Sequence, residues 1–484
     1  MKLTSVLMIS ALNSGAGKTT IATGLMAALT KRGLNVAGAK VGPDYIDPTF
    51  HTLATGNASY NLDTFMTGRA GALISASRAA MGADILVVEG VMGLFDGTRL
   101  DTVKSEFELE PIVANPRALT GSTAEIAMLL GAPIVLVVDA SGASDSIAAS
   151  VLGARAVNPS LQIVGVIANR VAGVRHVESI RTTLAEFGIP LFGWLARSSD
   201  EFMPSRHLGL IPVQERPAES RNSVRDLVGL IEDGFDIDRL LLYATELNMP
   251  QFSPKATDPA RYGTKIAIAT GRAFTFEYVE NRDILRELGA ELVDFDPTTD
   301  EALPEAVSGL IIGGGYPEVY IDQIAENRHL LESIATFASS GGVIWAECAG
   351  HMVLGASLDG KSLAGVHPGQ AEMGRSLTLG YRIASTSSEN PMFGPDEVFR
   401  AHEYHYSTMQ DGGSDLRAVG RTGTSTSGYV SPTIFSTYMH LHLGGSSTAA
   451  ARFLRAAQNR NVKGSRWSPE TSYQWATPPR IHTR

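Results

Sequence analysis

The chain has 484 residues and a formal net charge of −10, so it exceeds the size of a single hydrophobic core and predicts two or three domains. Its Lys and Arg residues form no stripe, which argues against nucleic acid as a main partner, and no apolar run reaches the roughly 18 residues that a membrane span needs. The single cysteine, Cys348, excludes an intrachain disulfide and a cysteine-cluster metal site, and it fits a reducing cytoplasm.

The first twelve residues (MKLTSVLMISAL) have the charge and apolar run of a short signal peptide. No small-x-small cleavage site follows, and cleavage would destroy the nucleotide motif that comes next. The sequence therefore predicts a retained N-terminal strand and a cytoplasmic protein.

The first half of the chain alternates short apolar runs with helical patterns. Buried strands are predicted at Ser5–Leu12, Ile85–Glu89, Ile134–Asp139 and Ile163–Asn169, and a helix at Thr19–Arg32. Alternation of this kind is typical of a parallel α/β sheet covered on both faces. We expect this domain to span residues 1–245, followed by a polar linker at 246–262.

A glycine-rich loop lies between the first strand and the first helix, with the sequence NSGAGKTT at residues 13–20. Small residues let backbone N–H groups converge on phosphate, and the helix N-terminus adds positive potential. We therefore expect a nucleotide phosphate to bind at Gly15, Gly17, Lys18, Thr19 and Thr20, with Lys18 on the β/γ-phosphates and Thr19 on Mg²⁺. Leu12 stands where the strict motif has glycine, so an ordinary strand–helix turn is the alternative.

Acidic residues follow later strands of the same half. Glu89 ends an apolar strand, where carboxylates of a parallel sheet face the ligand crevice, and Mg²⁺ prefers oxygen ligands. Glu89 is a predicted Mg²⁺ ligand, and Asp96 is a weaker candidate. Partition-type ATPases carry a second lysine five residues before the catalytic one; here that position is Asn13, which disfavours that class.

The second half predicts another α/β sheet, in a domain spanning residues 263–457. Strands are expected at Lys265–Ala269, Leu292–Phe295, Gly309–Ile312 and Gly342–Trp345. Residues 458–484 are polar and lack periodicity, which predicts a disordered tail.

Cys348 follows an apolar strand and precedes small residues. A nucleophile on a sharp strand–helix turn needs small neighbours, and such a turn exposes the sulfur above a helix N-terminus that lowers the pKa of a thiol. Backbone N–H groups of Gly314, Gly315 and Ala349 are the predicted oxyanion hole. An inert buried cysteine is the alternative.

A strand is predicted at Phe435–Leu443, presenting His440 and His442 on one face. A histidine beside a cysteine forms the nucleophile–base pair of acyl transfer. A metal site or structural imidazoles are the alternatives for the histidines alone.

Together these features resemble the cobyrinic acid a,c-diamide synthase family. The resemblance covers residues 4–457 and is carried by Lys40–Pro48 with His51, Asn61–Asp63, Glu89–Gly97, Gly121–Ala124, Arg206–Leu210, Gly313–Glu318 and His402–Ser407. It implies an α/β chain in which a dethiobiotin-synthetase-like P-loop domain with a parallel sheet is fused to a class I glutamine amidotransferase-like α/β domain.

The resemblance also implies a reaction. ATP phosphorylates the a and c carboxylates of a corrin-type macrocycle, and ammonia from L-glutamine displaces the phosphate. By this resemblance, Cys348 is the nucleophile and His440 is its base. Asp44, Tyr45 and Asp47 would face the substrate, and the two aspartates would also bind the metal. Asn169 would contact the nucleotide. Three positions depart from the usual pattern: Ala11 stands where relatives often have the leading glycine of the loop, Ala349 replaces glycine, and His442 stands where most class I glutaminases have glutamate.

Two other functions remain as alternatives. Cobyric acid synthase has the same architecture and amidates other carboxylates, but it lacks the GPDYIDP segment at residues 42–48. A regulatory P-loop ATPase with an inactive glutaminase-like domain is disfavoured by Cys348 and His440. The sequence leaves open whether the macrocycle holds cobalt, as in cobyrinic acid, or is metal-free hydrogenobyrinic acid, and whether the enzyme is a homodimer.

Overall fold

The computed structural model describes residues 4–98, 119–197, 205–206, 209–247, 263–421 and 423–461. The predicted linker from residue 248 on and the predicted tail from residue 462 on lie outside these ranges. Helix α13 (Ser447–Asn461) continues beyond residue 457, so residues 458–461 are helical rather than part of a tail.

The first half contains a sheet with the strand order β3-β2-β4-β1-β5-β6-β7, parallel throughout, and a short strand, β10, antiparallel to β1. Its strands are β1 (Ser5–Ala11), β2 (Val36–Val41), β3 (Tyr60–Leu62), β4 (Ile85–Glu89), β5 (Ile134–Asp139), β6 (Ile163–Val171), β7 (Leu191–Ala196) and β10 (Thr245–Glu246), with a separate pair β8 (Ser205–Arg206) and β9 (Gly209–Leu210). The helices are α1 (Lys18–Lys31), α2 (Asp47–Thr55), α3 (Thr64–Ala79), α4 (Thr123–Leu130), α5 (Ser146–Val157), α6 (Val174–Glu186), α7 (Pro217–Gly234) and α8 (Ile237–Leu241).

Alternating side chains of β1 explain why this sheet is covered on both faces. Val6 and Met8 belong to one buried apolar cluster, whereas Leu7 and Ile9 belong to another on the opposite face. Helices α1 and α7 pack together over the second of these clusters. The apolar run at residues 6–9 is therefore buried on both faces of the sheet, as the sequence predicts.

The second half contains a sheet with the order β12-β11-β13-β14-β22-β21, parallel except for the last pair. Its strands are β11 (Lys265–Ala269), β12 (Glu291–Phe295), β13 (Gly309–Ile312), β14 (Val343–Glu347), β21 (Tyr429–Ser431) and β22 (Ile434–Thr437). Around it lie α9 (Val279–Glu287), η3 (Pro317–Tyr320), α10 (Ile321–Glu326), α11 (Arg328–Ser339), α12 (Ala349–Leu354), η4 (Leu443–Gly445) and α13.

A further sheet of the second half is built on two long antiparallel strands, β17 (Gln370–Ser385) and β18 (Phe399–Gln410). The others are β15 (Ser357–Leu358), β16 (Lys361–Ser362), β19 (Leu416–Gly420), β20 (Gly423–Ser427) and β23 (Met439–His440). The single strand predicted at Phe435–Leu443 is wrong, because the chain leaves β22 after Thr437, pairs with β18 through β23, and then enters η4.

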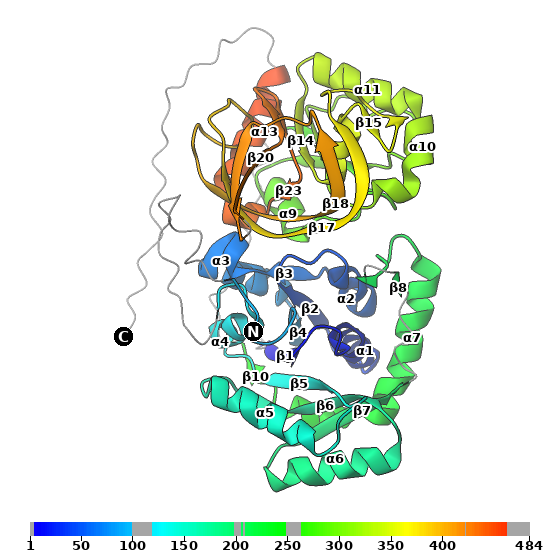
Figure 1. Cartoon of the computed structure of the whole chain (residues 1–484), viewed down its shortest axis with the longest axis vertical. Helices are drawn as coiled ribbons and strands as arrows, with labels where there is room; N and C mark the ends of the chain where they lie inside the picture. Colours follow the sequence, from blue (N-terminus) through cyan, green and yellow to red (C-terminus); the bar gives the residue numbers. More distant parts are fainter. Residues whose placement is uncertain are drawn as a thin grey trace.

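The two halves stack along the long axis of the molecule, with α3 and β3 of the first half facing the second half (Figure 1). Helix α3 packs against η4 and β18. A small apolar cluster contains side chains from both halves, namely Tyr45, Phe65, Met66, Phe276, Tyr278, Tyr316, Ile383 and Val419. The α/β fold class with two such domains is confirmed.

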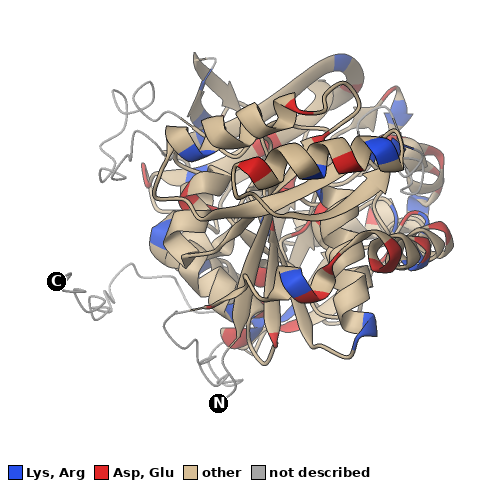
Figure 2. Ribbon diagram, turned by 90° about the horizontal axis from the view of Figure 1, so that it is seen from below, with Lys and Arg blue, Asp and Glu red and all other residues tan. Residues whose placement is uncertain are grey.

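Acidic and basic residues are interspersed along the outer helices of the first half (Figure 2). Lys31 of α1, for example, pairs with Glu232 of α7 at 2.6 Å on the surface, an exposed ion pair of small energetic weight. None of the helices in the described residues combines the length and apolarity of a membrane span.

Candidate active sites

The phosphate loop follows β1 and ends at α1. Gly15 and Gly17 have φ values of 76° and 93°, which residues with a side chain seldom adopt. A Cβ at Gly17 would lie 2.2 Å from Nδ2 of Asn169, so glycine is also needed there for space. Asn169 donates from Nδ2 to the carbonyl of Ala16 at 3.0 Å, which ties the loop to the end of β6.

Lys18, the first residue of α1, folds back over the loop. Its Nζ donates to the carbonyl of Met92 at 2.6 Å and to that of Asn13 at 3.2 Å. Burial and the nearby ammonium of Lys40 lower the pKa of Lys18 to about 8. Its cation is therefore poorly compensated by the protein alone, which suits a group whose partner is an anionic ligand. Thr20 follows in the same first turn.

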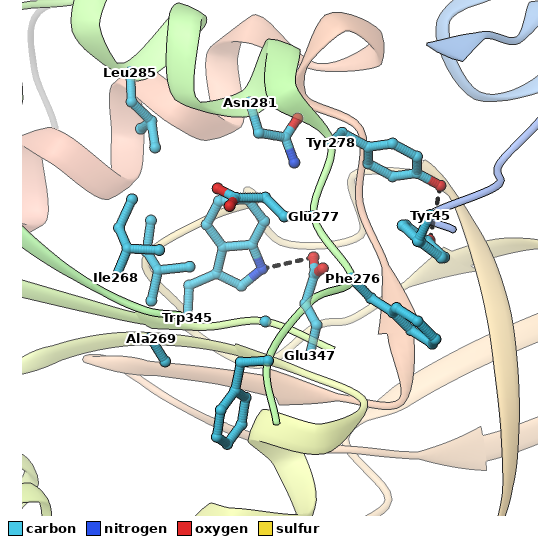
Figure 3. Close-up of a pocket in the computed structure, with 13 residues that line it drawn as sticks. Tyr45, Ile268, Ala269, Phe276, Glu277, Tyr278, Asn281, Leu285, Trp345 and Glu347 are labelled. Carbon is cyan, nitrogen blue, oxygen red and sulfur yellow. Dashed lines mark hydrogen bonds between the residues drawn. The ribbon is translucent and has the colours of Figure 1, made fainter. Parts of the chain in front are cut away.

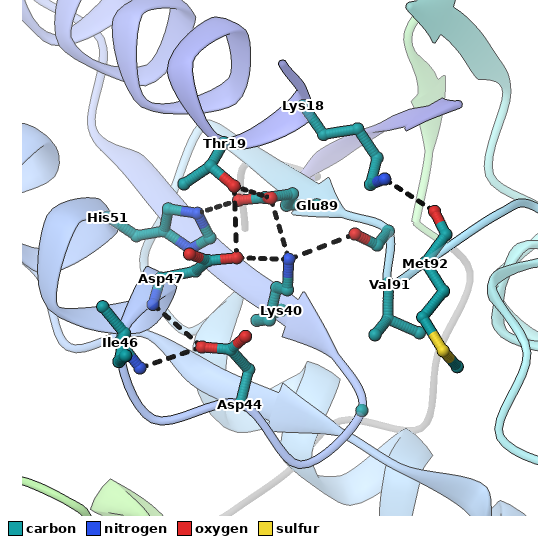
Figure 4. A network of polar contacts seen from close by, with 12 residues as sticks. Lys18, Thr19, Lys40, Asp44, Ile46, Asp47, His51, Glu89, Val91 and Met92 are labelled. Atoms are coloured by element: carbon teal, nitrogen blue, oxygen red, sulfur yellow. Dashed lines mark hydrogen bonds and ion pairs between the residues drawn. The ribbon is translucent and has the colours of Figure 1, made fainter. Parts of the chain in front are cut away.

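Thr19 joins the loop to a buried polar cluster (Figure 4). Its Oγ1 donates to Glu89 Oε1 at 2.7 Å and lies 3.2 Å from Asp47 Oδ2. Nζ of Lys40 contacts the same two carboxylates, at 2.5 Å from Asp47 and 2.8 Å from Glu89. Lys40 begins a segment that carries the family resemblance, but the sequence predicted no role for it. The pairing of β2 with β4 places it opposite Glu89.

Glu89 is fully buried, and its second oxygen is also paired. Nε2 of His51 lies 2.7 Å from Glu89 Oε2, and Nδ1 of His51 contacts Ser59 Oγ at 3.1 Å. Burial opposes ionisation, but Lys40 and His51 overcome it and hold the pKa of Glu89 far below its usual range. Glu89 is thus a carboxylate that stays ionised.

The predicted metal ligands separate into two groups. Thr19, Glu89 and Asp47 converge, whereas Asp44 accepts from the backbone N–H of Ile46 at 2.8 Å and of Asp47 at 2.9 Å through Oδ1 and so shapes the start of α2. No group of three His, Cys, Asp or Glu within the described ranges is arranged to hold a metal. A hydroxyl with two carboxylates nevertheless fits Mg²⁺ at a phosphate site, where phosphate oxygens and water complete the ligands.

Asp96 contacts the backbone rather than this cluster. Its Oδ2 accepts from the N–H of Gly93 at 2.9 Å, which closes the turn after β4. A Cβ at Gly93 would lie 2.6 Å from the carbonyl of Leu12, so this turn packs directly on the phosphate loop.

Cys348 stands between β14 and α12 in a strained conformation, with φ 49° and ψ −102°. A Cβ at Gly350 would lie 2.0 Å from the carbonyl of Ile312, so the turn needs glycine at that position. Ala349 is accommodated, and its N–H interacts with the sulfur of Cys348. The strand–nucleophile–helix turn inferred from the sequence is present.

The expectation of an exposed, low-pKa thiol is wrong. Cys348 is only 3% exposed, and Sγ lies 3.6 Å from the carbonyl of Tyr404. Burial, then the charge of Glu318, raise the pKa of Cys348 to about 12, and the N–H of Ala349 offsets this only in part. The thiol therefore needs a base to lose its proton.

His440, the predicted base, lies in β23, the short strand that follows β22. Cys348 donates its backbone N–H to Thr437 at the end of β22, and the chain reaches His440 three residues later. Nδ1 of His440 lies 3.6 Å from Oε2 of Glu347. In the part of the chain that the structure describes, neither imidazole nitrogen has a hydrogen-bond partner.

The glycine loop approaches the same imidazole. A Cβ at Gly314 would lie 2.3 Å from Cε1 of His440, and one at Gly315 would lie 2.0 Å from the carbonyl of Ala273. The N–H of Gly314 donates to the carbonyl of Phe276 at 3.3 Å. The N–H of Gly314 is thus engaged in this conformation, and the oxyanion hole formed by Gly314, Gly315 and Ala349 stays a prediction.

Tyr45 of the first half reaches the glutaminase half. Its hydroxyl lies 2.8 Å from that of Tyr278, and its ring stacks on Phe276 and lies 4.8 Å from the ring of His440. The family resemblance predicts that Tyr45 faces the substrate. In the structure, its ring is buried between the two halves. Figure 3 shows it facing Tyr278. Tyr45 and Glu347 both line a cavity of about 30 Å³.

Comparisons with known proteins agree with this division. Residues 7–210 match the CobQ/CobB/MinD/ParA nucleotide binding domain, and residues 265–448 match the CobB/CobQ-like glutamine amidotransferase domain. The chain is 40% identical to a hydrogenobyrinate a,c-diamide synthase of Streptomyces coelicolor, over 93% of this chain and 96% of that protein.

Two further relatives are matched over almost their whole length by this chain. A hydrogenobyrinate a,c-diamide synthase of Mycobacterium bovis is 36% identical over 94% of this chain and 98% of its own. A cobyrinate a,c-diamide synthase of a Synechococcus species is 37% identical over 93% of this chain and 98% of that protein. The resemblance seen in the sequence is confirmed: the chain belongs to the family of hydrogenobyrinate and cobyrinate a,c-diamide synthases.

Proposed function

We propose that this protein uses ATP and L-glutamine to amidate the a and c carboxylates of cobyrinic or hydrogenobyrinic acid in cobalamin biosynthesis. The observation that carries the proposal is the short segment between Asp44 and Pro48. Within it, Tyr45 contacts His440 of the glutaminase half, and Asp47 contacts Thr19 and Lys40 of the phosphate site. One loop thereby links the source of ammonia to the site of carboxylate activation.

The phosphate half would activate the substrate. A carboxylate oxygen attacks the γ-phosphorus of ATP, ADP leaves, and the resulting acyl phosphate carries a good leaving group. Lys18 compensates the charge on the transferring phosphoryl group, and Asn169 holds the loop and is our candidate for the nucleotide contact. Mg²⁺ held through Thr19, Glu89 and Asp47 would neutralise phosphate charge, while Lys40 keeps both carboxylates in place.

The glutaminase half would supply ammonia. Cys348 loses its proton to His440 and attacks the side-chain amide of glutamine, with the N–H groups of Gly315 and Ala349 facing the oxyanion. Ammonia leaves, and water hydrolyses the thioester to glutamate. Ammonia then displaces phosphate from the acyl phosphate, which gives the amide.

Transfer of ammonia between the sites depends on the seam at Tyr45. The cavity beside it is large enough for a molecule of the size of water or ammonia. Its lining combines the rings of Tyr45, Phe274, Phe276, Tyr278 and Trp345 with the polar side chains of Glu277, Asn281 and Glu347. We propose that the rings keep bulk water away from ammonia, which would otherwise be protonated.

A variant of Tyr45 tests this seam. In Tyr45→Ala, loss of the ring opens the seam, and we expect glutamate release to exceed amide formation, whereas the wild type stays close to equimolar. Tyr45→Phe keeps the stack on Phe276 and His440 and loses only the hydroxyl contact with Tyr278, so it should stay coupled. Glutamate and amide measured in the same reaction decide the matter. Equimolar products in Tyr45→Ala would contradict this role.

Asp44→Asn tests the acidic segment. The amide oxygen can still accept from Ile46 and Asp47, so the turn is kept while a negative charge near Lys40 is lost. We expect synthesis to require more Mg²⁺, with glutaminase activity at Cys348 little changed. Asp236→Asn, at the N-cap of the remote helix α8, is the matched control. Normal synthesis with unchanged Mg²⁺ dependence would leave Asp44 with a turn-forming role only.

Cobyric acid synthase-type amidation is the second candidate, since the family model of residues 7–210 covers both types. The family assignment favours the a and c positions. We also propose a cytoplasmic location, in keeping with a single cysteine.

A further inference from the structure

Most class I glutaminases have a glutamate two residues after the catalytic histidine, and this chain has none at that position after His440. The residue two positions on is His442, whose Nδ1 accepts from the N–H of Gly444 at 3.2 Å. Its Nε2 lies 3.8 Å from Glu280, in a buried group with Arg78 of helix α3. His442 is therefore held by the contact between the two halves rather than by His440.

Glu347 occupies the position that a histidine-orienting carboxylate needs. It is buried, directly precedes Cys348, and comes from β14. Oε1 accepts from Trp345 Nε1 at 2.8 Å (Figure 3). It also accepts from the N–H of Leu441 at 2.8 Å. Oε2 lies 3.6 Å from Nδ1 of His440. One oxygen is thus anchored, and the other faces the imidazole.

We propose that Glu347 is the positioning residue for His440 and completes a Cys348–His440–Glu347 arrangement. This inference rests on the glutaminase role proposed above. Oε2 accepts the Nδ1–H of His440, which leaves Nε2 free to take the thiol proton as the S–C bond to glutamine forms. His440 then returns that proton to the departing nitrogen as the C–N bond breaks. Such contacts are often long without substrate and shorten when it binds.

Glu347→Gln separates this role from a structural one. The amide oxygen can still accept from Trp345 and Leu441, so the local fold is kept. The NH₂ group instead faces Nδ1 and favours the tautomer whose Nε2 carries the proton and cannot take another. A histidine held in the wrong tautomer can cost up to about 10⁴-fold in kcat, and the longer contact here predicts about 10²-fold.

The sign of the effect is informative. The charge of Glu347 is one of the causes that raise the pKa of Cys348, after burial and Glu318. If Glu347 acted only as that charge, its removal would favour the thiolate and speed the reaction. A role through His440 requires the rate to fall.

The experiment is a double-mutant cycle on purified full-length protein, with glutamate release as the readout. Glu347→Gln should lower kcat by about 10²-fold with KM for glutamine little changed, and should have no further effect in a His440→Ala background. Trp345→Phe removes one donor on the anchored side of the same carboxylate and should lower kcat far less. Amidation with ammonium salt reports that each variant is folded.

Three other results would contradict the proposed role of Glu347, and one would contradict the role of His440. A normal or faster rate in Glu347→Gln overturns the inference, as does a loss that multiplies with His440→Ala. An equal loss in Trp345→Phe would assign Glu347 a structural role and also overturn it. If His440→Ala itself keeps glutaminase activity, the proposed function of that site fails instead.

Discussion

Cys348→Ser is expected to abolish glutamine-dependent amide synthesis while synthesis from a high concentration of ammonium salt remains. Serine is nearly isosteric, but its hydroxyl is a far weaker nucleophile than the thiol of a cysteine. Loss of a catalytic nucleophile commonly costs about 10⁴-fold or more in kcat. Ammonia bypasses this step because it enters after the glutaminase reaction. Amide formation with each nitrogen source gives the two rates.

A covalent label supplies the control. Cys348 is the chain's one cysteine, so an electrophilic glutamine analogue should add a single mass increment to the wild type and none to Cys348→Ser. If the folded variant cannot use ammonia, Cys348 has a role beyond glutamine hydrolysis, and the separation of the two sites proposed here is contradicted.

Lys18→Ala is expected to suppress amidation with either nitrogen source by roughly 10³-fold, the loss typical of removing one group that stabilises a charged transition state. The buried ammonium lies on the phosphate loop and acts before ammonia enters the reaction. Glutamate release without the macrocycle should change little. Rates of ADP formation and amide formation measure the effect.

Lys31→Ala is the matched control, because Lys31 lies on the same helix but is exposed and pairs with Glu232 on the surface. It should leave both rates near those of the wild type. Near-normal amidation in Lys18→Ala would remove the phosphate loop from the mechanism.

Local motifs made both sites predictable from the sequence. The phosphate loop and the cysteine turn each require small residues at fixed positions, and the strands Ile85–Glu89 and Ile134–Asp139 have the predicted bounds. Glycine at 17 and 350 is explained by contacts of 2.2 Å and 2.0 Å that a Cβ would make. Requirements of this kind are visible in one short segment.

Contacts between residues far apart in the sequence were not predicted: Tyr45 was expected to face substrate, and no role was predicted for Lys40 or Glu347. Tyr45 and Tyr278 are 233 positions apart, and Glu347 faces His440 only because β14 pairs with β22. Lys40 lies against Glu89 through the pairing of β2 with β4. A signal for Glu347 was present, namely a carboxylate directly before the nucleophile, but its direction depends on the path of the chain after β22.

The exposed thiol was predicted wrongly for a related reason. A strand–helix turn by itself exposes the nucleophile, but here β18 crosses above it and brings the carbonyl of Tyr404 to the sulfur. Burial by a remote strand outweighs the helix N-terminus, so the pKa of the thiol rises instead of falling.

The most direct test of the central claim is to incubate the purified enzyme with ATP, Mg²⁺, L-glutamine and either cobyrinic or hydrogenobyrinic acid, and to locate the amides in the product by mass spectrometry and NMR. We expect two amides, at the a and c carboxylates, with glutamate formed in equal amount to the amides. Amidation at other carboxylates, or unchanged macrocycles while ATP and glutamine are both consumed, would contradict the account.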